Sequence, residues 1–127
     1  MKKLNLNPKG LKTGDCVIRA ISYATDQTWD KVYKDLCDIG FKMKRLPNEK
    51  QVYEKYLEQL GWQKQKQPRH VDNTKYCVYE FTEYHKVPGV LVISVANHLT
   101  VVDNYEIVDT WDCSRKSVGN YWIKGGI

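Results

Sequence analysis

The chain has 127 residues, of which 42% are hydrophobic, 12% aromatic and 28% charged. This composition excludes a wholly disordered chain, because disordered chains are poor in aromatic and branched aliphatic residues. A formal net charge of +5 permits a nucleic acid or an acidic protein as partner but does not by itself indicate either. The length is typical of one domain with one core, so we expect a single domain over residues 1–127.

Two features of the sequence bear on its location in the cell. The longest apolar stretch, Val87 to Ala96, is interrupted by Pro88 and Gly89 and is much shorter than the roughly 20 residues of a membrane-spanning helix. The opening MKKLNLNPKG is basic but lacks the apolar run of about 7 to 15 residues that a secretory signal carries. We therefore expect no contact with membranes and a location in the cytoplasm.

The cysteines argue against a metal-binding or disulfide-rich protein. They lie tens of residues apart and form no C-x-x-C pair of the kind that binds zinc. Disulfide bonds are rare in a reducing cytoplasm. We therefore expect neither a metal nor another cofactor, and each thiol is interpreted alone. The cysteines are Cys16, Cys37, Cys77 and Cys113.

The first predicted helix begins with two residues of chemical interest. In DCVIRAISYA, apolar residues recur at helical spacing, and Asp15 is of a type that caps helix N-termini. We expect the Asp15 carboxylate to point at the N–H groups of the first turn. Cys16 then lies in that turn, where the positive end of the helix dipole favours a thiolate.

Two more helices follow in the first half of the chain. The second is predicted to run from Thr28 as N-cap to Gly40 as stop signal. The third begins after Pro47 and Asn48 and closes at Gly61. Both carry apolar residues at helical spacing, so we expect them to form one side of the core.

The second half is predicted to contain a short helix and then strands. Residues 74–85 are predicted to form a helix with Phe81 and Tyr84 facing inward. Residues 90–96, VLVISVA, form an apolar run of strand length that is rich in β-branched residues. A last strand is expected near Tyr121. Helices followed by strands predict the α+β class.

The next two predicted strands, NHLTVV and YEIVDTW, suggest a polar pair on a hairpin. They are separated by Asp103 and Asn104, residue types that adopt the left-handed conformations of a tight turn. With these two residues as the turn, His98 lies directly opposite Asp109. Opposite residues have Cβ atoms about 4.5 to 5.5 Å apart, close enough for an imidazole to bond a carboxylate. The hairpin thus predicts a His–Asp pair.

Cys16, His98 and Asp109 together supply a nucleophile, a base and a carboxylate that orients the base. The alternative is structural. A lone cysteine usually packs as a small apolar residue, and a strand histidine usually satisfies its hydrogen bonds in the core or at an edge. Spacing alone leaves both interpretations open.

Two segments resemble thiol peptidases. TGDCVIRAIS resembles the Cys box of papain-like cysteine peptidases, and five of its residues correspond to the D-G-N-C-L-F-R-A pattern of the ovarian-tumour deubiquitinases, with Asp15 in the place of the Asn. NHLTVVDNYEIVDTWDC resembles the other half of a papain-like site, in which a His opens one strand and an Asp or Asn ends the next. The two segments are similar to small cysteine peptidases of bacteriophages and prophages of Gram-positive bacteria. The corresponding residues of the first segment are Gly14, Asp15, Cys16, Arg19 and Ala20.

This resemblance implies a papain-like architecture, in which N-terminal helices pack on a small C-terminal antiparallel sheet. It also implies that Cys16 is the nucleophile, that His98 acts as base and then as acid, and that Asp109 orients His98. The implied substrate is a protein or peptide, cleaved through a thioester. A phage-encoded protein of this kind would act in the host cytoplasm.

The pattern lacks one part of a papain-like site, the second hydrogen-bond donor for the oxyanion. The backbone N–H of Cys16 is the expected first donor. Many papain-like enzymes place a Gln six residues before the Cys, but Gly10 occupies that position and the nearest amide side chain is Asn7. Asn7, a loop N–H or nothing supplies the second donor. The last case favours an alternative function, a binding or inhibitory module that has lost turnover.

Residues beside the hairpin have a site role and an ordinary alternative. Asn97 and Asp112 flank the His–Asp pair, although such polar residues commonly form turns. Asp112 is the second candidate for orienting His98. Trp111 is a candidate to shield the pair from water, although tryptophan usually packs in a core. The candidates for substrate or oxyanion binding are Asn7, Asp15, Asn97 and Trp111.

A third hypothesis is a nucleic-acid-binding accessory protein. Tyr121 and Trp122 lie near basic residues, a mixture found where aromatic rings stack on bases. The sequence contains no recognised nucleic-acid motif. Net charge and this segment are its only support.

Overall fold

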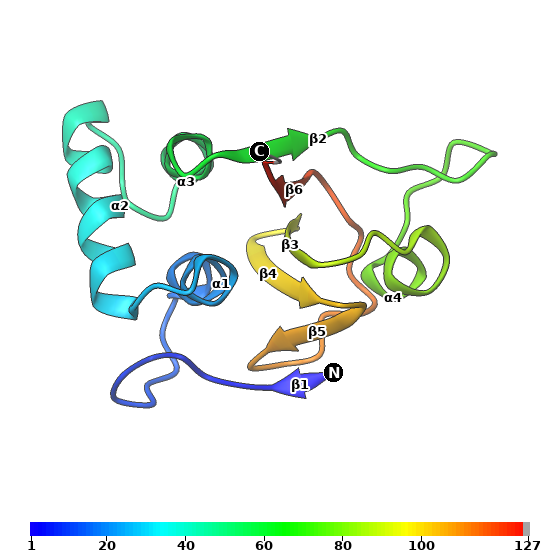
Figure 1. The fold of residues 1–127 in the computed structure, drawn as a ribbon, viewed down its shortest axis with the longest axis horizontal. Helices are drawn as coiled ribbons and strands as arrows, with labels where there is room; N and C mark the ends of the chain where they lie inside the picture. Colours follow the sequence, from blue (N-terminus) through cyan, green and yellow to red (C-terminus); the bar gives the residue numbers. More distant parts are fainter. Residues whose placement is uncertain (126–127) are drawn as a thin grey trace.

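A six-stranded mixed sheet forms the middle of the protein, in the order β1-β5-β4-β3-β6-β2 (Figure 1). The computed structural model describes residues 1–125, so the last two residues of the predicted domain 1–127 lie outside the described residues. Neighbouring strands are antiparallel, except that β1 pairs in parallel with β5. The strands are β1 (Lys2–Lys3), β2 (Trp62–Gln65), β3 (Val90–Val95), β4 (His98–Asp103), β5 (Glu106–Asp109) and β6 (Tyr121–Lys124).

Helices cover both faces of the sheet, and the predicted α+β class is confirmed. Three helices pack on one face, and a short helix that continues as a π-helix packs on the other (Figure 1). Side chains alternate between the faces along a strand, so Val101 joins the core beneath α1 and Val102 joins the opposite core. The helices are α1 (Cys16–Thr25), α2 (Trp29–Met43), α3 (Lys50–Gln59), α4 (Val78–Glu80) and the π-helix η1 (Phe81–His85).

The helix ends agree with the sequence pattern at α3 but not at α2. Gly61, with φ +86°, follows the end of α3 as predicted. The predicted stop at Gly40 is wrong, because α2 continues to Met43 and ends at Lys44 with a left-handed φ of 59°. Gly40 serves a different purpose. The chain turns back over it so closely that a Cβ atom there would lie 2.6 Å from the backbone oxygen of Arg45.

The helix predicted over residues 74–85 is wrong before Val78 and wrong in placing Tyr84 inward, whereas the inward position of Phe81 is confirmed. Only α4 and η1 are helical in this segment. The N–H of Lys86 bonds to the carbonyl oxygen of Phe81 across the wider π turn. A wider turn changes which residues share a face. Phe81 is accordingly buried, whereas Tyr84 is 70% exposed.

The hairpin of β4 and β5 forms with a register different from the predicted one. Its turn is at Asn104 and Tyr105, which have φ values of 45° and 71°, and Asp103 pairs with Glu106. Positive φ at both central residues is typical of the turns that match strand twist. The turn therefore lies one residue later than predicted. The expectation that His98 lies directly opposite Asp109 is wrong.

The change of register leaves the direction of the side chains unchanged, because β5 is shifted along β4 by two residues, an even number. The observed register places Thr100 opposite Asp109 and makes His98 a diagonal neighbour of Asp109. A slip by one position would turn a side chain to the other face, but a slip by two does not. Diagonal neighbours remain within reach of long side chains. His98 and Asp109 therefore still point to the same side of the hairpin.

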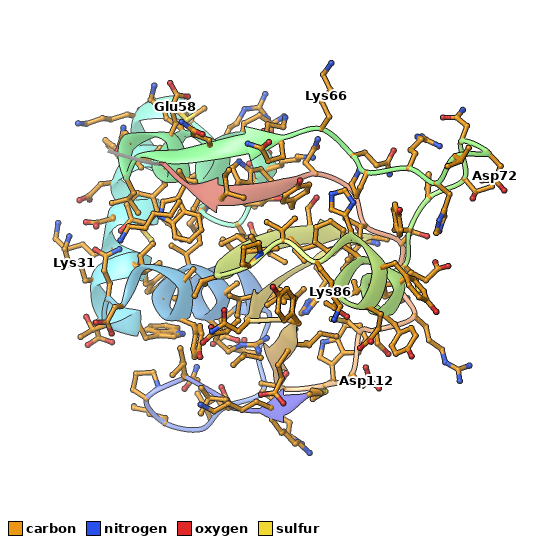
Figure 2. The ribbon with its side chains drawn as sticks, turned by 45° about the vertical axis from the view of Figure 1, so that its right-hand side comes forward. Lys31, Glu58, Lys66, Asp72, Lys86 and Asp112 are labelled. Atoms are coloured by element: carbon orange, nitrogen blue, oxygen red, sulfur yellow. The ribbon has the colours of Figure 1, made fainter. Side chains whose placement is uncertain are left out.

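The surface is rich in charged groups. Figure 2 shows the side chains of Lys31, Glu58 and Lys66 projecting outward from the ribbon, and all three are exposed. In residues 1–125, no helix combines the length and the apolar character needed to cross a membrane.

Candidate active site

The site lies where the first turn of α1 meets the β4–β5 hairpin. Cys16 is the first residue of α1, His98 is the first of β4, and Asp109 is the last of β5. α1 packs directly against β4. The fold thus brings together the three residues that the sequence singles out.

The Asp109 carboxylate is buried and accepts hydrogen bonds on both oxygens. Its Oδ2 accepts from His98 Nε2 at 2.6 Å and from Thr100 Oγ1 at 2.6 Å. Its Oδ1 accepts from the Thr110 N–H at 2.7 Å and from Arg19 Nη1 at 3.3 Å. Burial would raise the pKa of Asp109, but the hydrogen bonds from His98 and Thr100 outweigh it, and the pKa lies below 3.8. Asp109 is therefore a fixed carboxylate.

The Asp109 carboxylate holds the side chain of His98 in place. Its side chain is 8% exposed, and Nε2 is used on Asp109, which leaves Nδ1 free to exchange a proton. Burial would lower the pKa of His98. Hydrogen bonds to Asp109, Cys113 and Cys16 and the charge of Asp109 act in the other direction and raise the pKa to about 11. The geometry therefore favours an imidazolium.

Cys16 has the opposite shift. Burial would raise the pKa of its thiol, but hydrogen bonds from the His98 side chain and the Leu99 N–H, with the charges of His98 and Arg19, lower it below 9.0. The same contact therefore raises the pKa of His98 and lowers that of Cys16. This arrangement favours a thiolate–imidazolium pair.

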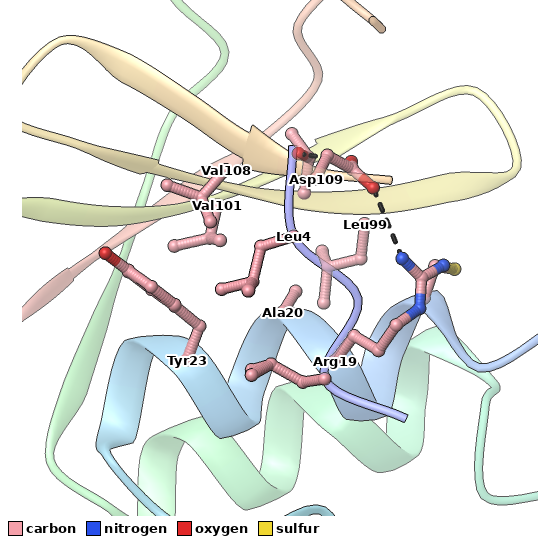
Figure 3. Close-up of a pocket in the computed structure, with 11 residues that line it drawn as sticks. Leu4, Arg19, Ala20, Tyr23, Leu99, Val101, Val108 and Asp109 are labelled. Carbon is pink, nitrogen blue, oxygen red and sulfur yellow. Dashed lines mark hydrogen bonds and ion pairs between the residues drawn. The ribbon is translucent and has the colours of Figure 1, made fainter. Parts of the chain in front are cut away.

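Arg19 joins the two halves of the site, and its role was not predicted. Arg19 Nε lies 2.8 Å from Asp15 Oδ1, and Arg19 Nη1 lies 3.3 Å from Asp109 Oδ1. Figure 3 shows the guanidinium reaching from α1 to Asp109, with the small cavity between helix and sheet beside it. The signal in the sequence was the spacing, because residues three and four apart share a helix face, which puts Arg19 beside Cys16 and Asp15.

The expected orientation of Asp15 is wrong. Its carboxylate makes no capping hydrogen bond to α1. It accepts instead from Asn7 Nδ2 at 3.1 Å, Arg19 Nε at 2.8 Å and Trp29 Nε1 at 2.9 Å, and the residue is 4% exposed. Three strong side-chain donors compete successfully with the helix N–H groups. The first turn of α1, next to Cys16, keeps its own donors available.

Asn7 is also placed differently from the expectation. Its amide donates to Asp15, and its Oδ1 accepts from the N–H groups of Lys9 and Leu11 at 2.9 and 3.3 Å. The residue is 8% exposed. Asn7 thus organises the loop before α1 and orients Asp15. None of these contacts supports its predicted role as an oxyanion donor.

A cleft of about 500 Å³ opens beside Cys16 and His98. Asn97 lines it from the β3–β4 turn, where it is exposed and has a left-handed φ of 55°. Tyr53 of α3 also lines it, and no sequence pattern indicated a role for Tyr53 in the site. The cleft is large enough for a short segment of peptide.

The residues after β5 divide into a neighbour of His98 and a surface residue. The Trp111 ring lies 4.8 Å from the His98 ring and is 40% exposed, so it covers one side of the imidazole. Asp112 is exposed and accepts from the Ser114 N–H at 2.9 Å; Figure 2 shows it on the outer loop. Asp109 occupies the position on His98 for which Asp112 was the second candidate.

One group in the described residues has ligand types suited to a metal ion. His98, Asp109 and Cys113 offer nitrogen, oxygen and sulfur atoms that lie within 4.8 Å of one another. Ligands sharing a tetrahedral zinc ion are held about 3.3 Å apart or more by the metal–ligand lengths. The 2.6 Å contact between His98 Nε2 and Asp109 Oδ2 therefore fits a direct hydrogen bond better than a shared metal.

Comparison of the chain with models of protein families, with curated proteins and with solved structures finds no match. The chemistry of the site itself is therefore the basis for a function.

Proposed function

We propose that this chain is a cysteine peptidase or a related amide or isopeptide hydrolase with a papain-like arrangement. Cys16 is the nucleophile, His98 the acid and base, and Asp109 the carboxylate that orients His98. The observation that carries the proposal is the hydrogen bond between Asp109 and His98 at the cleft that His98 shares with Cys16, together with opposite pKa shifts on His98 and Cys16. The substrate class is a protein or peptide.

Catalysis proceeds in two halves. The Cys16 thiolate attacks the carbonyl carbon of an amide, a C–S bond forms, and the carbonyl electron pair moves to oxygen. When the tetrahedral intermediate collapses, the C–N bond breaks and His98 gives its proton to the departing amine. Water then attacks the thioester while neutral His98 takes its proton. The C–S bond then breaks, the carboxylic acid product leaves, and the thiolate–imidazolium pair is restored.

Two features assist these steps. Asp109 keeps the His98 ring in one orientation throughout, because it is itself held by Thr100 and Arg19. The N–H of Cys16, at the start of α1, is a donor for the oxyanion, since the Asp15 carboxylate is turned away from the first turn. No step requires a cofactor.

A second candidate is a papain-like binding or inhibitory module without turnover, acting on a host factor. The observation that favours it is that the buried Asn7 amide donates to Asp15, and no contact places this amide where an oxyanion would form. This candidate predicts a reactive Cys16 that forms no acyl intermediate.

The proposal is tested by alkylation with iodoacetamide at pH 6, followed by mass spectrometry of each cysteine peptide. We expect Cys16 to react at least about tenfold faster than Cys37 and Cys77, because a thiol of ordinary pKa near 8.5 is almost fully protonated at that pH. His98→Ala should remove most of this advantage. His85→Ala is the matched control, since His85 stacks on Phe81 away from the cleft.

Equal, slow labelling of the three cysteines in the unmodified protein would contradict the proposal. So would a His98→Ala variant that keeps the full reactivity of Cys16 at pH 6 while remaining folded by circular dichroism.

A further inference from the structure

Two further buried side chains that line the cleft beside Cys16 end in a hydroxyl, those of Ser94 and Tyr53. The Ser94 hydroxyl is used on the carbonyl oxygen of Asn120. Tyr53 is 7% exposed and projects from α3. Its ring packs edge-on against Trp122, with centroids 5.8 Å apart and an interplanar angle of 75°. The buried ring is fixed on rigid elements, so the position of the hydroxyl is fixed as well.

The Tyr53 hydroxyl has no hydrogen-bond partner within residues 1–125, whereas the hydroxyl of Tyr56 on the same helix does. Tyr56, one turn further along α3, donates to Asp35 at 2.7 Å and accepts from Gln27 at 3.2 Å. In the same described part of the chain, Ser22 Oγ is the only fully buried polar side-chain atom without a partner. The unpartnered Tyr53 hydroxyl is therefore not enclosed by the core. Tyr53 lines the cleft beside Cys16 and His98.

The electrostatic environment makes this hydroxyl a donor next to the nucleophile. Burial raises the pKa of Tyr53, and the charges of Glu54 and Cys16 add to this, so that it reaches about 12. The phenol therefore keeps its proton at every pH at which the proposed reaction would run. Cys16 and Tyr53 line the same cleft.

We propose that the Tyr53 hydroxyl donates the second hydrogen bond to the oxyanion that forms when Cys16 attacks a carbonyl. This inference rests on the proposed function and supplies the donor that Gly10 and Asn7 do not. As the C–S bond forms, the carbonyl electron pair moves onto oxygen, and the Cys16 N–H and the Tyr53 O–H approach that charge from two sides. Tyr53 gives up no proton and returns unchanged.

The test compares two reactions of Cys16 in the full chain. 4-Nitrophenyl acetate acylates the sulfur through a tetrahedral oxyanion and releases 4-nitrophenolate, whereas iodoacetamide alkylates the sulfur by direct displacement of iodide without an oxyanion. In Tyr53→Phe we expect acylation to slow roughly 100-fold, the loss typical of one oxyanion donor. Alkylation at pH 6 should change less than about twofold. Tyr56→Phe is the matched control and should change neither rate beyond about twofold.

Each outcome separates this inference from the proposed function. Fast acylation of the unmodified protein with an unchanged rate in Tyr53→Phe overturns the role of Tyr53 alone. Equal slowing of acylation and alkylation also overturns it, because Tyr53 would then act only on the position or ionisation of Cys16. An unmodified protein that is neither alkylated rapidly nor acylated overturns the proposed function, and the inference with it.

A second measurement keeps the test independent of the stability of Tyr53→Phe. 3-Fluorotyrosine placed only at position 53 retains the ring and the hydroxyl, and its ¹⁹F NMR signal needs no assignment. Addition of N-acetylglycinal, which forms a hemithioacetal with Cys16, should shift this signal, while the same label at position 56 should not move. Modification of Cys16 without a shift at position 53 overturns the inference.

Discussion

Asp15 stands where a helix N-cap usually turns toward its own helix, yet its carboxylate is locked by Asn7, Arg19 and Trp29. This places a buried negative charge beside Cys16 without letting it occupy the first turn of α1. A carboxylate turned toward the sulfur would raise the pKa of the thiol. The three donors therefore keep the Asp15 carboxylate from raising the pKa of the Cys16 thiol. Arg19 also forms an ion pair with Asp109.

The pH dependence of stability tests this role of Asp15. Burial would raise its pKa, but hydrogen bonds from Asn7, Arg19 and Trp29 and the charge of Arg19 lower it below 3.8. A lowered pKa contributes stability that is present above pH 3.8 and is lost as the pH falls through the folded value. We expect Asp15→Asn to reduce the free energy of unfolding by about 3 kcal/mol at pH 7. The difference in free energy of unfolding between the variant and the unmodified protein should be smaller at pH 3.

Urea unfolding at pH 3 and at pH 7 measures the difference in free energy of unfolding between Asp15→Asn and the unmodified protein. Asp38→Asn, at an exposed ion pair with Lys34, is the control and should show no measurable change. A difference of the same size at pH 3 and pH 7 would show that the charge of Asp15 contributes nothing.

At the scale of elements, the hairpin shows what a sequence pattern can and cannot predict. The alternation of residues predicted that His98 and Asp109 share a face, and this survived although the predicted turn was misplaced by one residue. The choice between two adjacent turns depends on how the strands pack against their neighbours. Period-2 alternation does not contain that information.

The remaining site residues depend on contacts between distant elements. Arg19 reaches the site because α1 packs on β4, Thr100 because β4 pairs with β5, and Tyr53 lines the cleft from α3. Of the three, only Arg19 had a signal in the sequence, its spacing from Asp15 and Cys16. The polar edge strands β1 and β2 escaped prediction for a related reason. An edge strand has solvent on one side and needs little apolar alternation.

Gly40 provides a prediction that belongs to α2. Helix propensity favours Ala over Gly by about 1 kcal/mol, but a Cβ atom at this position would lie 2.6 Å from the backbone oxygen of Arg45. We expect Gly40→Ala to lower the free energy of unfolding by about 2 kcal/mol, as overpacking does. Lys42→Ala, on the exposed side of the same helix, should change it by less than about 0.5 kcal/mol. A higher free energy of unfolding for Gly40→Ala in urea would contradict the close approach of the Arg45 carbonyl to Gly40.

On the scale of the whole molecule, the site exists only through tertiary structure. The helices of the first half and the hairpin of the second half each supply one part, and α1 contacts both β3 and β4 in the middle of the sheet. Neither half brings Cys16 next to His98 by itself. The reactivity of the thiol is therefore a property of the folded chain and not of a local motif.

This dependence gives a cooperative signature. As urea increases, we expect the rapid alkylation of Cys16 at pH 6 to disappear with the same midpoint as the loss of circular dichroism, as in a two-state transition. Cys113, which is 1% exposed, should become reactive over the same range at higher pH. Loss of Cys16 reactivity well before the main transition would instead indicate that the site opens locally.

The contact between Trp111 and His98 has an optical consequence. An imidazolium quenches the fluorescence of a neighbouring indole more strongly than a neutral imidazole does, and the Trp111 ring lies 4.8 Å from His98. The emission of this one tryptophan is thus coupled to the proton on His98. Trp111 fluorescence is therefore expected to report whether His98 is protonated.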